Sequence, residues 1–104
     1  DEQFVEAARV LATRTLDEVG DDRQRLERMF QRCTVRTPQA AEVARLLTAL
    51  EHFRARYRAA PEDAAALIQI GEAPTSATHA AEELAAWTMI ANSLLNLDAT
   101  IVRS

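Results

Sequence analysis

The stretch from Glu82 to Val102 constrains the fold most, because its apolar residues recur at the spacing of an α-helix. They follow one another at steps of three and four and so share one side of a helix. They are Leu84, Trp87, Ile90, Ala91, Leu94, Leu97 and Ile101. Trp87 is the only tryptophan of the chain. A stripe this broad must be covered by other elements, so the sequence predicts a final helix around which the rest of the chain packs.

Two helices are predicted before residue 37 from their capping residues. The first runs from about Glu2 to Val19 and ends at Gly20, which tolerates the left-handed backbone of a C-terminal cap. Asp21 and Gln24 form a capping-box pattern, in which each side chain accepts a backbone N–H of the other residue. This pattern predicts the start of a short second helix.

Prolines mark the starts of two further helices. A hydroxyl N-cap at Thr37, followed by proline at the first helical position, predicts a long helix from Pro38 to about Ala59. Pro61 is followed by two acidic residues, which suit the first turn of a short helix that ends at Gly71.

Short connections between amphipathic helices favour an all-α architecture. The only loop of any length is predicted at residues 72–78, with Thr78 as the N-cap of the last helix. Residues 1–104 are therefore expected to form a single-domain bundle of about five amphipathic helices. The 104 residues fit one domain, and the presence of only two glycines agrees with helices joined by short turns.

The composition narrows the possible partners. The net charge of −4 does not favour non-specific binding to nucleic acid or to an anionic membrane. No apolar run is long enough for a membrane span, and no basic start followed by an apolar core marks a signal peptide. Because the chain begins without methionine, we expect it to be an excised piece of a longer protein.

All twelve basic residues are arginine, and nine of them lie within residues 21–60, beside five acidic residues. Four of them share one edge of the predicted second helix and the turn after it; this arginine edge consists of Arg25, Arg28, Arg32 and Arg36. It could bind nucleic acid, or it could be a solvated face or pair with acidic residues of the first and fourth helices. The second interpretation is favoured, because acids interleave with the arginines and no aromatic residue or lysine accompanies them.

Few residues could carry chemistry. His52, His79 and Cys33 form none of the usual metal-binding spacings, so no metal and no other cofactor is expected. Cys33 lies on an apolar stripe and is expected to be a buried small hydrophobe. His52 is expected on the surface, and His79 in the first turn of the last helix without a partner. No residue is predicted to be catalytic, because no nucleophile, base and carboxylate come together in a recognisable motif.

Asp98 is the one carboxylate on the margin of the last apolar stripe, and Asn96 lies close to it in sequence. A buried carboxylate needs hydrogen-bond partners. We expect Asp98 to accept hydrogen bonds from another helix end or from an arginine; a catalytic part is the alternative.

Three segments carry a resemblance to a known family: QFVEAARVLATR, RTPQAAEVARLLTALEHFRARY and ELAAWTMIANSLLNLDATIVR. In matching order they resemble the C-terminal segment of a planctomycete-type domain of unknown function. That domain is found in large exported bacterial proteins that often also carry a cytochrome c-like haem module. The most specific part is the run from Trp87 to Asp98. The chain departs from the family at Val35, where glycine is usual, and at Ala99 and Thr100, where an acidic-aromatic pair is usual.

The resemblance implies an exported, for example periplasmic, parent protein, and it transfers no catalytic residue. The sequence therefore predicts a non-catalytic structural or docking domain at the C-terminal end of a larger exported bacterial protein. Its expected partners are the upstream domains, with self-association as a further option. A second hypothesis is that the chain forms one wall of a catalytic or redox site completed upstream, with Asp98, Asn96 or the arginine edge facing that site. A third, minor hypothesis is a helical nucleic-acid-binding module.

Overall fold

The computed structural model describes residues 2–70 and 79–103, and the side chains of residues 4–70 and 79–97. Within these residues the chain forms helices and no strand, which confirms the predicted all-α bundle. The helices are α1 (Glu2–Asp17), α2 (Asp22–Cys33), α3 (Ala40–Ala59), α4 (Pro61–Ile68) and α5 (Ala81–Arg103). Gly71 and Thr78, predicted as a helix end and an N-cap, lie outside the described residues.

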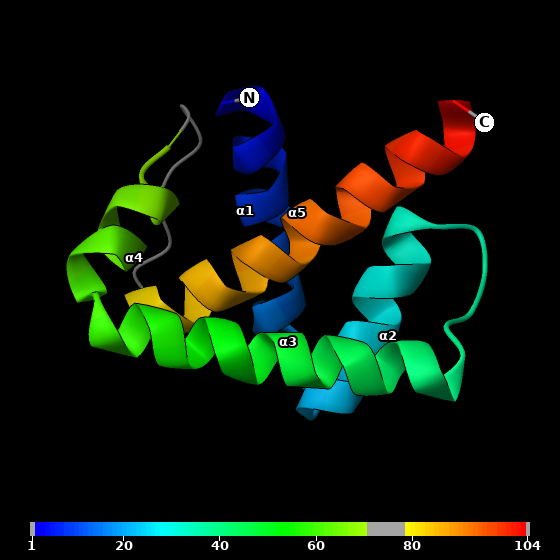
Figure 1. Ribbon diagram of the computed structural model, residues 1–104, viewed down its shortest axis with the longest axis horizontal. Helices are drawn as coiled ribbons and strands as arrows, with labels where there is room; N and C mark the ends of the chain where they lie inside the picture. Colours follow the sequence, from blue (N-terminus) through cyan, green and yellow to red (C-terminus); the bar gives the residue numbers. More distant parts are fainter. Residues whose placement is uncertain (1, 71–78, 104) are drawn as a thin grey trace.

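Helix α5 is the element against which the others pack. It crosses the molecule diagonally in Figure 1, and α1, α3 and α4 each make their most extensive contacts with it. Five residues of its predicted apolar stripe are buried: Leu84, Trp87, Ile90, Ala91 and Leu94. The first half of α5 is also covered on its other sides, because Ala85, Ala86 and Thr88 are fully buried. The prediction that the chain is organised around this helix is thus confirmed.

The stripe of α5 is not covered along its whole length. Leu97 was predicted to be covered by other helices, but 41% of its surface is exposed. Figure 1 shows the reason, since α5 diverges from α3 towards its C-terminal end. The side chain of Ile101 lies outside the described part.

The first two helices meet at a turn that differs from the prediction at one end. Helix α1 ends at Asp17 rather than Val19, so Gly20 is not its C-terminal cap. Gly20 instead precedes the N-cap of α2 with a positive φ of 152°. The capping box of α2 is confirmed: the Gln24 N–H donates to Asp21 at 2.8 Å, and the Asp21 N–H donates to the Gln24 side chain at 3.0 Å.

Helix α3 begins at Ala40, so the predicted start at Pro38 with Thr37 as N-cap is wrong. Gln39 is the N-cap, and its N–H donates to the Glu42 carboxylate at 2.8 Å. The Gln39 N–H therefore donates to the Glu42 carboxylate, whereas the prediction had the hydroxyl of Thr37 as the acceptor at this helix start. Helix α4 also ends earlier than predicted, at Ile68.

We expect Gly20→Ala to destabilise the chain by about 1–3 kcal/mol, because a φ of 152° is strained for a residue with a Cβ atom. The new Cβ would also lie 2.5 Å from the Arg28 guanidinium. Urea unfolding of the variant measures the loss. Introducing Gly20→Ala into an Arg28→Ala background removes the closest contact and leaves the backbone strain. An unchanged stability in that background would show that the strain is negligible.

Candidate functional site

Arg54 of α3 joins three helices through carboxylate groups. Its guanidinium donates to Asp22 of α2 at 2.8 and 3.0 Å, and to Glu83 of α5 at 3.0 Å. It also contacts Glu51, one turn earlier on α3, at 2.6 Å. Only 12% of the Arg54 side chain is exposed. These four residues, here called the Arg54 cluster, therefore fix α2 and α5 against α3 with charge-assisted hydrogen bonds.

The charges of the Arg54 cluster are stabilised by one another. Hydrogen bonds from Arg54 hold the pKa of Asp22 below its ordinary value. Burial acts to raise the pKa of Glu83, but hydrogen bonds from Arg54 and from the Trp87 indole N–H, at 3.0 Å, outweigh it and lower that pKa. Both carboxyl groups are therefore ionised at neutral pH, as a clamp between helices requires.

Sequence reasoning missed the Arg54 cluster. Asp22 and Glu83 lie in the first turns of α2 and α5, where a carboxylate is favourable without any partner on another helix. No spacing along the chain links Arg54 to Glu83, which is 29 residues away, or to Asp22, which is 32 residues away. Only the packing of α3 against both α2 and α5 brings them together.

The arginine edge binds the end of α1. Arg25 donates to the carbonyl oxygens of Leu16 and Glu18 at 3.3 and 3.1 Å. Arg28 donates to the Val19 carbonyl at 2.8 Å and to the Glu18 carboxylate at 3.0 Å. These groups satisfy carbonyls that a helix end leaves without partners, and they place positive charge at its negative end.

Glu18 is the shared anion of this edge. Besides its bond to Arg28 it forms an ion pair with Arg32, and hydrogen bonds from these two arginines lower the pKa of Glu18. The alternative in which the arginines pair with acids of this chain agrees with the structure. The acids differ in part from those predicted, since they lie just after α1 and on α3 rather than on α4.

The last arginine of the edge connects α2 and α3. Arg36 forms a two-pronged pair with the Glu42 carboxylate, at 2.7 and 2.6 Å, and lies over the Phe30 ring at 4.9 Å. The Arg36 guanidinium and the Gln39 N–H lower the pKa of Glu42 to about 2. The loop between the two helices is thereby tied to both.

This pair gives a direct titration test. In a carboxyl NMR titration, we expect Glu42 to have a pKa of about 2, and Arg36→Ala to raise that pKa towards the ordinary value for glutamate. Arg23→Ala is a matched control on α2, because none of the causes of the Glu42 shift involves Arg23. An unchanged pKa of Glu42 in the Arg36 variant would contradict the assigned cause.

The three residues considered as metal ligands lie in different parts of the fold: Cys33 in α2, His52 in α3 and His79 before α5. Cys33 is buried and His52 is exposed, as predicted, and the His52 ring meets the Phe53 ring edge-on at 6.0 Å between centroids. The expectation that His79 lies in the first turn of the last helix without a partner is wrong. This histidine precedes α5, and its Nε2 lies 2.6 Å from the Asp17 carboxylate at the end of α1. The two residues are 62 positions apart, so the sequence carried no sign of the pair.

Of the two candidates on α5, only Asn96 has a side chain that the structure describes. Asn96 is exposed, and the side chain of Asp98 lies outside the described part. Within residues 2–70 and 79–103, no three His, Cys, Asp or Glu side chains gather as metal ligands. In the same ranges, no helix is long and apolar enough to cross a membrane.

A hollow of about 210 Å³ opens between α2, α3 and α5. It is lined by Phe30, Glu42, Arg45, Leu46, Leu94 and Leu97. Phe30 and Leu94 are buried at its base, whereas Leu97 is 41% exposed. The divergence of α5 from α3 (Figure 1) leaves this space uncovered. The hollow was not predicted, because the regular stripe of α5 gave no sign of where its cover would end.

The comparisons with known proteins identify no relative. No family model matches the chain, and no curated protein or solved structure is significantly similar to it. The resemblance to a domain of exported bacterial proteins thus stays a prediction from the sequence motifs.

Proposed function

We propose that the chain is a non-catalytic docking domain of a larger exported bacterial protein, and that it binds its partner at the hollow between α2, α3 and α5. The observation that carries the proposal is the apolar lining of this hollow, with a leucine that is 41% exposed on its rim. A hollow with this lining offers a place where an apolar side chain of a partner can leave water.

The energetics favour an apolar side chain as the inserted group. Burying a leucine or phenylalanine side chain contributes about 1.5–3 kcal/mol. A few side chains that are fully buried in pockets commonly carry most of the binding energy of an interface. Leu46, Leu94 and Leu97 would supply most of the apolar contacts.

The ion pairs support a rigid hollow. Arg36 and Glu42 tie α2 to α3 at one side, and Arg54 ties α3 to α5 further along. The walls come from the same three helices. A site whose walls are already fixed loses little conformational entropy on binding, which increases affinity.

The parent protein and its export are inferred from the sequence resemblance. The proposed partner is accordingly an upstream domain of the same protein. Self-association through the same hollow would use the same side chains and is distinguished by the stoichiometry of the complex.

Methyl NMR tests the proposal at the level of single residues. Adding the upstream domains to the labelled chain should shift the methyl signals of Leu46, Leu94 and Leu97, and leave those of Ile68 unchanged. Leu97→Asp should abolish these shifts. Val10→Asp on α1 is the matched control, since Val10 is 42% exposed and does not line the hollow. Equal effects of the two variants, or shifts confined to other faces, would reject the hollow as the docking site.

A further inference from the structure

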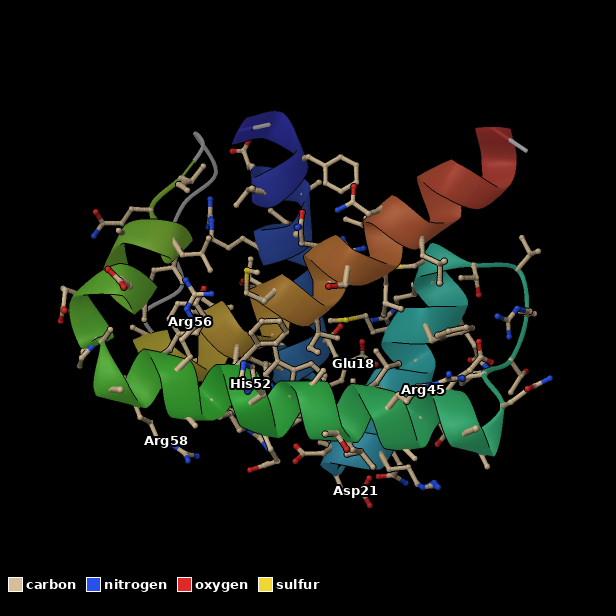
Figure 2. The ribbon with its side chains drawn as sticks, viewed as in Figure 1. Glu18, Asp21, Arg45, His52, Arg56 and Arg58 are labelled. Carbon is tan, nitrogen blue, oxygen red and sulfur yellow. The ribbon has the colours of Figure 1, made fainter. Side chains whose placement is uncertain are left out.

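A stripe of basic side chains continues from the hollow along α3. Arg45, which lines the hollow, is followed seven and eleven residues later by His52 and Arg56, and all three are exposed. At 100° per residue these positions lie within about 40° of one another on a helix. Figure 2 shows them along one side of α3, with Arg58 on the other side. They are called the basic stripe below.

The carboxylates of α3 do not neutralise this stripe fully. Glu42 is held by Arg36, and Glu51 is held by Arg54. Arg56 lies over the Tyr57 ring at 5.4 Å. Among the residues that the structure describes, neither Arg45 nor Arg56 forms an ion pair, although Arg45 is close enough to Glu42 to act on its charge.

The surface of α3 between the side chains of the basic stripe allows a partner helix to approach closely. Ala49 lies between Arg45 and His52 on the same side of α3, and its side chain is small. From Arg45 to Arg56 the stripe is about 16 Å long, at a rise of 1.5 Å per residue. A partner helix lying along α3 would cover this length with about three turns.

We infer that the partner segment is an acidic amphipathic helix. It places an apolar side chain in the hollow and a row of carboxylates opposite Arg45, His52 and Arg56. This inference rests on the proposed docking function and adds the chemistry of the partner. Complementary charge selects the partner and its orientation, while the apolar side chain supplies the affinity. A protein partner is favoured over nucleic acid, because the apolar hollow beside the stripe suits an inserted apolar side chain.

The test uses designed helical peptides with a leucine or phenylalanine flanked by glutamates at the spacing of the basic stripe. A matched peptide carries glutamine in place of each glutamate, and a second carries lysine. Calorimetry or fluorescence anisotropy measures binding to the intact chain at low and at high salt. We expect the glutamate peptide to bind most tightly, and its affinity to fall as salt is raised.

Two variants of α3 then test whether the effect of charge on peptide binding depends on the basic stripe. Arg45→Glu should weaken binding of the glutamate peptide by about tenfold or more, and should restore binding of the lysine peptide. Arg58→Glu makes the same charge change on the other side of α3 and should alter the affinity less than about twofold. Equal effects of the two variants would overturn the inference, since they would indicate a general charge effect.

The remaining outcomes separate the inference from the proposed function. If the glutamine and glutamate peptides bind equally, and Leu97→Asp abolishes binding of both, the hollow is a docking site but the acidic partner is wrong. If no peptide binds and Leu97→Asp also leaves association with the upstream domains unchanged, both ideas fail. Tighter binding of duplex DNA than of the glutamate peptide, lost in Arg45→Glu, would replace the inference with a nucleic-acid surface.

Discussion

Trp87→Ala is expected to reduce the free energy of unfolding by about 3–5 kcal/mol, the usual effect of removing a large aromatic side chain from a core. The Trp87 side chain is fully buried in the helix against which the others pack. A domain of this size has a total stability of about 5–15 kcal/mol. The variant should therefore lose a large share of the stability of the chain.

Urea unfolding followed by circular dichroism measures this effect without relying on tryptophan fluorescence. Trp87→Phe retains much of the ring but loses the N–H that donates to Glu83, so we expect a smaller loss of about 1–3 kcal/mol. His52→Ala, an exposed control, should change the stability by less than about 0.5 kcal/mol. A loss below about 1 kcal/mol for Trp87→Ala would contradict the central place of α5 in the core.

Arg54→Met is expected to reduce the free energy of unfolding by about 1–3 kcal/mol at pH 7, because it leaves the carboxylates of Asp22 and Glu83 without their shared cation. The value is set below that for a fully buried pair, since about a third of each carboxylate side chain is exposed. Arg58→Met removes an exposed arginine from the same helix and should have little effect.

The pH dependence identifies the cause of this loss. In the unchanged chain the folded-state pKa values of Asp22 and Glu83 are lowered. Their contribution to stability is therefore present above about pH 4, the ordinary carboxyl range, and is lost as the pH falls through the lowered values. In Arg54→Met, burial of Glu83 disfavours its charged form, a penalty that is relieved by acid. The difference in stability between the two proteins should thus be largest near pH 7 and shrink below about pH 4.

A difference in stability that stays constant from pH 7 to pH 3 would contradict this account. It would indicate that Arg54 acts through the packing of its aliphatic part rather than through its charge.

The helices could be predicted from sequence because the signals that define them are local. The capping box of Asp21 and Gln24 and the apolar spacing of α5 each involve residues within a few turns of one another. The ends of α1 and α3 were less predictable for a physical reason. Arginines of α2 satisfy the last carbonyls of α1, and Glu42 supplies the acceptor at the start of α3.

The candidate site was harder to predict, because it depends on how the helices pack. The pair of His79 and Asp17 and the Arg54 cluster join residues far apart in the chain. The exposure of Leu97 follows from the angle between α5 and α3, which the apolar stripe does not encode. Pairing of the arginine edge with acids of this chain was one of the predicted alternatives, since its charges are interleaved with carboxylates.

Light scattering on a size-exclusion column tests the docking function most directly. The chain is run alone, then mixed with the upstream domains, and the mixture is repeated with Leu97→Asp and with Val10→Asp. We predict a complex of defined mass for the unchanged chain and for Val10→Asp, and separate components for Leu97→Asp. A chain that stays monomeric beside the upstream domains, or a complex that Leu97→Asp leaves intact, would contradict docking through the hollow.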